Sequence, residues 1–243
     1  MKIELRAVSK SYGKARALDR ASLEIGGGQI VAILGANGAG KTTLLRCLAG
    51  IAAPDSGAIV YNDEPFERDK LDLRRQLFFL PDFPVVFYEM SILRHIGMVL
   101  RVYERDEPGI EARVLQLLKD FDLFTIAENP LNSLSRGQVY KAALVALIAV
   151  NPAVWLLDEP FASGMDPHGI NMLKRYAREA VTQGRTILYS TQILEIVEKF
   201  SGKVCILHQG EVRAFDSVTL LENTGQGGGL EDIFRQLREE EAP

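Results

Sequence analysis

A glycine-rich segment between an apolar stretch and a helix-forming one constrains the fold of this 243-residue chain more than any other feature. Residues 35–43 read Gly-Ala-Asn-Gly-Ala-Gly-Lys-Thr-Thr and match the pattern G-x-x-x-x-G-K-[ST]. Glycines let such a backbone bend until consecutive N–H groups and a helix N-terminus point into one anion-sized hollow. The segment therefore predicts a site for a nucleoside triphosphate. The residues assigned to it are Gly35, Asn37, Gly38, Ala39, Gly40, Lys41, Thr42 and Thr43.

Three side chains of this segment have distinct expected roles. Lys41 can reach the terminal phosphates, the hydroxyl of Thr42 is placed to bind Mg²⁺, and that of Thr43 meets a nearer phosphate. A glycine-rich turn of chance composition is the alternative. The apolar run 30–34 before the segment and the helix-forming run 44–49 after it argue against that alternative, although the segment alone does not say which nucleotide is bound.

Composition and charge narrow the class of protein. With 47% hydrophobic and 25% charged residues the chain is an ordinary globular protein, and a net charge of -4 gives no basic footprint for nucleic acid. Charged residues interrupt the apolar start, so no signal peptide is predicted and we expect the chain in the cytosol. The longest apolar run, 142–150, has about half the length that a membrane-spanning helix needs. At a membrane, another chain would have to supply the span.

The order of the patterns predicts the architecture. Residues 1–34 alternate like β structure, with 26–28 as a hairpin turn between strands at 21–25 and 30–34, and the pattern becomes helical from 91 to about 124. From 154 to 208 strand and helix patterns alternate, which is typical of a parallel sheet with crossover helices. We expect an α/β fold: a parallel-sheet core (1–82 and 151–223), an N-terminal antiparallel β lobe within it, an inserted α-helical subdomain (about 83–150), and a glycine-rich linker with a C-terminal helix (224–243).

The cysteines and histidines have the pattern of structural residues. Cys47 and Cys205 each stand alone in an apolar stretch, without a neighbouring ligand at metal spacing, so we expect buried thiols. His95, His168 and His208 are scattered and receive the same interpretation.

Two acids supply the second half of the predicted site. The apolar run 154–157 ends in Asp158 and Glu159, and the carboxyl end of a sheet strand is where α/β folds place ligand chemistry. Asp158 is the expected Mg²⁺ ligand. Glu159 can orient and deprotonate a water molecule for attack on a γ-phosphate. If Asp158 and Glu159 stood alone, we would interpret them as two acids solvated at a strand end.

They are accompanied by Leu-Ser-Arg-Gly-Gln at 134–138, which opens the helix before the acidic strand. Here the chain resembles the ABC ATPases over residues 3 to about 223, which implies a P-loop NTPase core. Their signature loop, LSGGQ, reaches across a dimer to the γ-phosphate bound by the partner. By this resemblance Tyr12 stacks on adenine, residues 162–166 link the two sites, and the signature loop consists of Ser135, Arg136, Gly137 and Gln138.

The chain departs from the family pattern at two sensing positions. Asp82 stands where the family commonly has Gln, and Gln192 where it has His. Asp82 can still give an oxygen to Mg²⁺, but it adds negative charge beside a triphosphate. Gln192 keeps an amide donor for the γ-phosphate but cannot become a cation. We expect a slow Mg²⁺-dependent ATPase with Glu159 and Gln192 as its catalytic residues.

The resemblance leads to one main hypothesis for function. The chain would be the ATP-hydrolysing subunit of a membrane transporter, most like those of exporters with a separate permease chain, and would lie at the cytoplasmic face through that integral membrane partner. Its dimer could be two copies or a pair with a related ATPase. In the family the segment after position 82, here 83–91, lies beside the permease's coupling helix, and its apolar residues 84–88 fit that contact or burial under the chain's own helices equally well.

Two alternatives stay open at this point. One is a soluble relative that acts on DNA or ribosomes, which the acidic balance and the lack of a long coiled coil disfavour. The other is a regulatory ATP-binding protein with weak hydrolysis, because both sensing positions are altered.

Overall fold

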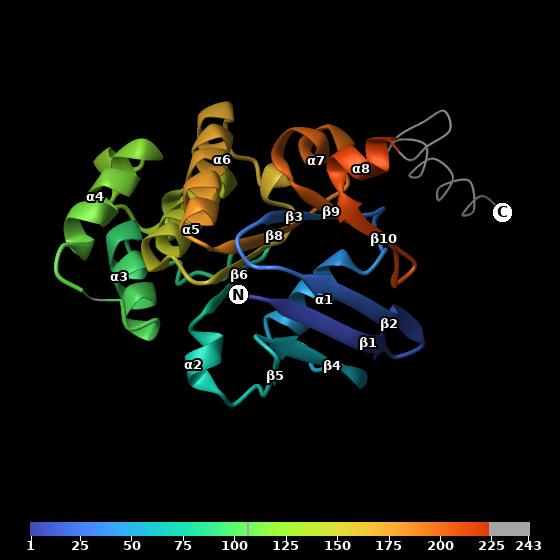
Figure 1. Cartoon of the computed structure of the whole chain (residues 1–243). Coiled ribbons are helices and arrows are strands. Elements are labelled where there is room, and N and C mark those ends of the chain that lie inside the picture. The colour runs from blue at the N-terminus through green and yellow to red at the C-terminus, as the bar shows by residue number, and fades with distance from the viewer. Residues whose placement is uncertain (106, 224–243) are drawn as a thin grey trace.

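Two sheets form the framework of the protein, which we describe from a computed structural model over residues 1–105 and 107–223. The smaller sheet is antiparallel, has four strands in the order β2-β1-β4-β5, and forms the N-terminal lobe (Figure 1). Its long strands β1 and β2 place alternate apolar side chains such as Ile3, Leu5, Leu23 and Ile25 in the core, as period-two patterns predict. The strands are β1 (Ile3–Tyr12), β2 (Ala15–Ile25), β4 (Ser56–Tyr61) and β5 (Glu64–Pro65).

The larger sheet has six strands in the order β10-β9-β3-β8-β7-β6. All its neighbours are parallel except the edge strand β10, which runs antiparallel to β9. The strands β3, β7 and β8 are buried along their whole length, because helices cover a parallel sheet on both faces. The strands are β3 (Ile30–Leu34), β6 (Leu77–Leu80), β7 (Val154–Leu157), β8 (Thr186–Thr191), β9 (Lys203–His208) and β10 (Glu211–Ser217).

The helices α3, α4 and α5 come between β6 and β7 and gather at one end of the molecule (Figure 1). This arrangement confirms the predicted α/β fold with an antiparallel lobe and a helical insertion, whereas the exact domain boundaries stay predictions. The helices are α1 (Lys41–Leu48), α2 (Leu71–Arg74), α3 (Ile92–Val102), α4 (Ile110–Asp120), α5 (Arg136–Val150), α6 (Pro167–Thr182), α7 (Leu194–Phe200) and α8 (Val218–Asn223). Short 3₁₀ turns lie at Phe124–Ile126, Leu131–Ser133 and Pro160–Ala162.

The predicted hairpin at residues 26–28 is wrong. β2 pairs with β1 in the small sheet, whereas β3 pairs with β8 and β9 in the large one. The glycines do reverse the chain, with Gly28 at a φ of 69°, but they carry it from one sheet to the other. Turn residues show that the chain bends and do not show which strand it meets next.

Helix α5 is the centre of the helical region. Its apolar run 142–150 is buried all round, because the helix packs against α3, α4, α6 and β6. This burial explains the run without a membrane. Among the described residues, no helix combines the length and the apolar character needed to cross a bilayer.

Both cysteines and two of the three histidines are buried. Cys47 and Cys205 are free and buried, and burial raises their thiol pKa values to about 11 and about 12. His95 and His208 are also buried, whereas His168 is exposed. The predicted linker and helix at 224–243 lie outside the described residues.

Candidate nucleotide site

The glycine-rich segment forms a loop between β3 and α1, and backbone atoms of neighbouring segments lie close to its glycines. A Cβ at Gly35 would lie 2.4 Å from the carbonyl oxygen of Leu207, and one at Gly40 would lie 2.3 Å from that of Ala17. Gly40 also has a φ of 104°, which L side chains rarely adopt. Both positions therefore require glycine for a steric reason.

Lys41 is held inside this loop. Its buried Nζ donates to the carbonyl oxygens of Gly35 and Ala36, both at 3.0 Å, and lies 3.4 Å from Oε1 of Glu159. These contacts place the ammonium group beside the cradle. The cavity over the loop has a volume of about 350 Å³. It is lined by Ala17, Asn37, Gly38, Gly40, Lys41, Thr42, Thr43 and Glu159.

The two acids lie at the same sheet edge as the cradle. Because β8 lies between β3 and β7, the carboxyl ends of all three strands meet there. Asp158 is buried, and its Oδ1 accepts hydrogen bonds from Oγ1 of Thr42 at 3.0 Å and from Oγ of Ser190 at 2.7 Å. A hydroxyl and a carboxylate in contact form the hard-oxygen set that Mg²⁺ prefers, so these residues fit the metal that the sequence predicts. Sequence reasoning gave no role to Ser190, although it stands two residues before Gln192.

Glu159 occupies a strained position next to Asp158. Its φ is 46°, in the left-handed region that favours glycine, and its N–H donates to Oγ of Ser190 at 2.8 Å. Burial is the largest influence on its carboxyl and raises the pKa, with Lys41 opposing and the charges of Asp158 and Asp82 adding to the rise. A carboxyl with a raised pKa beside a phosphate site is suited to take a proton from water.

Gln192 and Tyr12 lie at the edges of this region. Gln192 is exposed and directly follows β8. The preceding residue, Thr191, accepts a hydrogen bond at its carbonyl from the N–H of Gly35 at 3.3 Å, so the backbone next to Gln192 adjoins the cradle. Tyr12 ends β1 opposite Ala15 of β2 with its ring about half exposed, and Ala17 of β2 lines the cavity. Both positions fit the roles that the sequence predicts, which remain predictions.

The signature segment lies outside the cavity of its own chain. Ser135 is the N-cap of α5: its Oγ accepts from the N–H of Gln138 at 3.3 Å, and its own N–H donates to Oε1 of Gln138 at 2.9 Å. This capping box holds the helix start in shape. Among the described residues that line the cavity, none comes from 134–138.

Asp82 has a partner that the sequence did not predict. Nη2 of Arg136 donates to its Oδ1 at 2.5 Å, and the guanidinium carbon lies 4.2 Å from the centre of the Phe83 ring. Asp82, which stands where the family commonly has Gln, therefore contacts Arg136, which stands at the first glycine position of the LSGGQ pattern.

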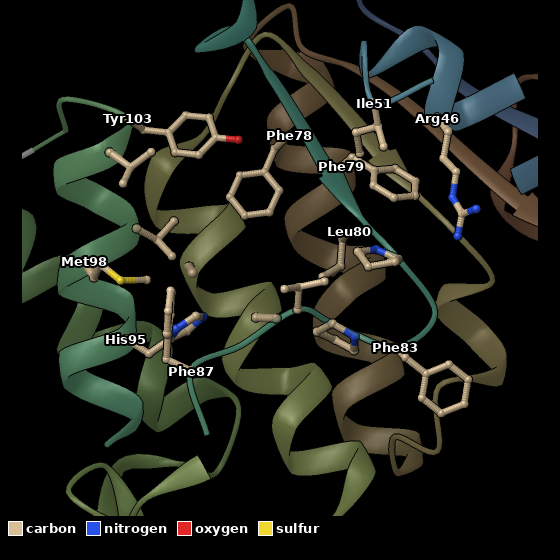
Figure 2. A pocket seen from close by; sticks show the side chains of 17 residues that line it. Arg46, Ile51, Phe78, Phe79, Leu80, Phe83, Phe87, His95, Met98 and Tyr103 are labelled. Atoms are coloured by element: carbon tan, nitrogen blue, oxygen red, sulfur yellow. The ribbon is translucent and has the colours of Figure 1, made fainter. Parts of the chain in front are cut away.

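A second hollow lies between α1, the segment after β6, and α3 (Figure 2). It has a volume of about 560 Å³ and a mainly apolar lining. Phe83, Val85 and Phe87 are strongly exposed along it, whereas Val86 is buried, so the segment presents alternate side chains to solvent. The imidazole of His95 also lines this groove, and its buried Nδ1 has no hydrogen-bond partner among the described residues. Of residues 84–88, Val85, Phe87 and Tyr88 are exposed and fit a contact surface, whereas Pro84 and Val86 are buried.

Comparison with known proteins identifies the family. A family model described as ABC transporter matches residues 18–162. The ABC-type transporter ATP-binding protein EcsA of Bacillus subtilis (strain 168) is 31% identical, with 99% of this chain and 98% of the relative covered. The chain belongs to the ABC transporter family. Within it, the full-length match makes the chain an ATP-binding subunit of this transporter class.

Other ABC relatives differ in the direction of transport that their names give. The Nod factor export ATP-binding protein I of Paraburkholderia xenovorans (strain LB400) is 31% identical over 99% of this chain and 80% of its own length. A sulfate/thiosulfate import ATP-binding protein, CysA of Bordetella pertussis (strain Tohama I / ATCC BAA-589 / NCTC 13251), is 39% identical over 73% of this chain and 51% of its own. A solved structure described as the ATP-binding subunit of an ABC transporter superposes with a TM-score of 0.91 at 28% identity, covering 98% of this chain and 100% of that one.

Proposed function

We propose that this ABC subunit binds and hydrolyses ATP with Mg²⁺ to drive an exporter whose membrane-crossing part is a separate permease. The observation that carries the proposal is the chain of contacts from Thr42 through Asp158 to Ser190, with Lys41 and Glu159 beside it. It joins the cradle, the strand-end acids and β8 in one polar cluster. Such a cluster has the parts that phosphoryl transfer requires, which are positioning groups, a metal site and a base.

Each residue of the cluster has a task in this proposal. The loop N–H groups of Gly38 and Gly40 and the ammonium of Lys41 bind the phosphates, and Tyr12 stacks on the base. Thr42 and Asp158 hold Mg²⁺, which neutralises phosphate charge when it is bound. Glu159 takes the proton of the attacking water, and Gln192 donates a hydrogen bond to the γ-phosphate.

A second ATPase chain completes the site. Because the signature segment does not line its own chain's cavity, Ser135 and the N–H of Gly137 are available to a nucleotide bound elsewhere. A helix N-terminus with free donors is an anion site. ATP would thus join two chains, either two copies or this chain with a related ATPase, and hydrolysis would release them.

The apolar groove gives the place for the permease. Exposed aromatic and aliphatic side chains around a hollow of this size mark a contact surface. The unpaired Nδ1 of His95 offers one polar contact inside it, which a docking segment of the permease can satisfy. The subunit would then lie at the cytoplasmic face as a peripheral protein.

Phosphate release by the purified protein tests the catalytic part. We expect Mg²⁺-dependent release that the Glu159→Gln variant lowers at least about 100-fold, because a general base is removed. The variant keeps the cradle and should still bind ATP, and it should accumulate a dimer in light scattering. Equal rates for the two proteins would contradict the assignment of Glu159.

Membrane association tests the permease part. In cells that express the chain with the integral membrane protein that co-purifies with it, Val85→Glu and Phe87→Glu should move the subunit from the membrane to the supernatant while basal ATP hydrolysis stays unchanged. Leu115→Glu, on the exposed side of α4, is the matched control and should stay with the membrane. Retention of both groove variants would remove the groove from the interface.

The alternative of a regulatory ATP-binding protein has one observation in its favour, which is that Asp82 and Gln192 replace the usual sensors. It predicts ATP-driven dimers without turnover, so the phosphate-release assay decides between the two functions. Export is tested by comparing small molecules in cells and medium with and without Glu159→Gln. An exported compound accumulates inside the variant cells, whereas an imported one is depleted there.

A further inference from the structure

Two substitutions relative to the family pattern form one contact, although 54 residues separate them in the chain. Asp82 stands in the loop after β6, and Arg136 is the first residue of α5. The side chain of Asp82 is about one third exposed and that of Arg136 is just under half exposed, so the ion pair is partly accessible to solvent. The guanidinium also stacks on Phe83, which restricts it from a second direction.

Each charge alone would be unfavourable where it lies. Asp82 adds a negative charge near Glu159 and near the phosphate site, and its charge is one of those that raise the pKa of Glu159. Arg136 puts a cation at a helix N-terminus, where the helix dipole favours anions. Paired at 2.5 Å, the two charges largely cancel, so the contact resolves both problems at once.

The other side of the signature segment is already fixed. A Cβ at Gly137 would lie 2.3 Å from the carbonyl oxygen of Gly164, and the side chain of Arg136 passes close to the same glycine. One turn further along α5, Lys141 donates to Asp166 at 2.6 Å. The helix start is thus held by the loop after β7 on one side, and the Asp82 contact holds it on the other.

We propose that Asp82 is a positioning residue of the signature segment: through Arg136 it sets the orientation in which Ser135 and Gly137 meet the nucleotide of the second chain. This role takes the place of the Mg²⁺ contact that the sequence predicted for Asp82. It rests on the proposed function, because it requires a nucleotide shared by two chains. Arg136 and Asp82 then form a matched pair, and replacing either one alone leaves the other charge uncompensated.

A double-mutant cycle tests the pairing. Asp82→Gln and Arg136→Gly, each of which installs the family residue, are made singly and together in the Glu159→Gln background, and ATP-driven dimerisation is measured by light scattering. We expect Asp82→Gln alone to weaken dimerisation about 5-fold, and the double variant to return to within about 2-fold of the parent. Glu4→Gln removes an acid from an exposed ion pair on β1 and serves as the control without effect. Losses that simply add in the double variant would overturn the proposal.

A magnesium titration separates the two roles of Asp82. Binding of a fluorescent ATP analogue is followed against Mg²⁺ concentration. A positioning residue leaves the half-saturating Mg²⁺ concentration within about 2-fold in Asp82→Gln, whereas loss of a metal contact raises it about 10-fold or more. If the half-saturating Mg²⁺ concentration rises in Asp82→Gln but not in Arg136→Gly, Asp82 is a metal ligand and the proposal is overturned. If the parent binds the analogue but forms no dimer, the shared site itself is wrong, and the positioning role falls with it.

Discussion

The backbone at Gly137 touches the backbone at Gly164: a methyl group added to Gly137 would lie 2.3 Å from the carbonyl oxygen of Gly164. Real Cβ atoms do not approach an oxygen so closely, so the start of α5 and the loop after β7 can meet this closely only with glycine at position 137. In the proposed dimer this contact ties the signature segment to the loop at 160–166, which directly follows Glu159, the proposed general base.

Replacing Gly137 by alanine should therefore separate these two segments. We expect a loss of about 1–3 kcal/mol in the free energy of unfolding, because the added methyl group overpacks a rigid backbone contact. ATP-driven dimerisation should weaken as well. Gly97→Ala in α3, where a Cβ meets open space, is the matched control and should be neutral or stabilising by up to about 1 kcal/mol. Urea unfolding of both variants checks the prediction, and similar losses in the two would contradict it.

Asp166 carries two tasks at the start of α6. Its side chain caps the helix by accepting from the N–H of Gly169 at 2.7 Å, and it accepts from the buried ammonium of Lys141 at 2.6 Å. The hydrogen bond from Lys141 is the main reason that its pKa is lowered. Asp166→Ala should cost about 2 kcal/mol, since the cap is lost and a buried cation loses its partner. Asp166→Asn keeps the cap oxygen and should lose less. Thermal unfolding at pH 7 compares them. Equal losses in the two variants would argue against the cap, and an Asp166→Asn variant as stable as the parent would argue against the ion pair.

Glu159 should set the acidic limb of the pH–rate profile. The carboxyl group of Glu159 must be ionised to act as a base, so the rate of phosphate release falls as the pH drops through the pKa of Glu159. Because burial raises that pKa, the limb lies above the ordinary value of 4.5. Asp82→Asn removes one of the charges that raise it and should shift the limb to lower pH. Circular dichroism over the same range verifies that the protein stays folded. A limb at or below 4.5 in the parent would contradict the raised pKa.

His95 should make stability depend on pH. Burial lowers its pKa below the ordinary 6.5, so the unfolded chain binds the proton more readily than the folded one. The stabilising effect of neutral His95 is complete above the unfolded pKa and is lost as the pH falls from about 6.5 through the lowered folded pKa. His95→Phe fills similar space without a titratable group and should show a smaller loss of unfolding free energy across this window. Parallel curves for both proteins would rule out His95 as the cause.

Much of the fold could be predicted because its signals are local. The buried strands β3, β7 and β8 appear as short apolar runs, and the long helix α5 as an apolar run next to a cap. The edge strand β10 was missed, since its half-exposed side chains show no period. The hairpin at 26–28 was wrong because sheet membership depends on partners more than 150 residues away.

The site shows the same division. Spacing and strand ends predicted that Lys41, Asp158 and Glu159 lie together, and the structure brings them together. The sequence did not predict that Ser190 supports both acids or that Arg136 meets Asp82. Each of those contacts joins segments whose relative placement is set only by the packed sheet, so inspection of either segment alone gives no signal.

The position of β3 also bears on how the protein is made. This strand carries the phosphate loop, but its two neighbours in the sheet are β8 and β9, which end at residues 191 and 208. During synthesis the loop therefore exists for most of the time on a strand without neighbours, and non-local pairing of this kind forms late. A ribosome-bound chain that stops before residue 208 has the whole nucleotide motif and still lacks a neighbour of β3. Capture of ATP should begin only after that last parallel strand has left the ribosome and joined the sheet.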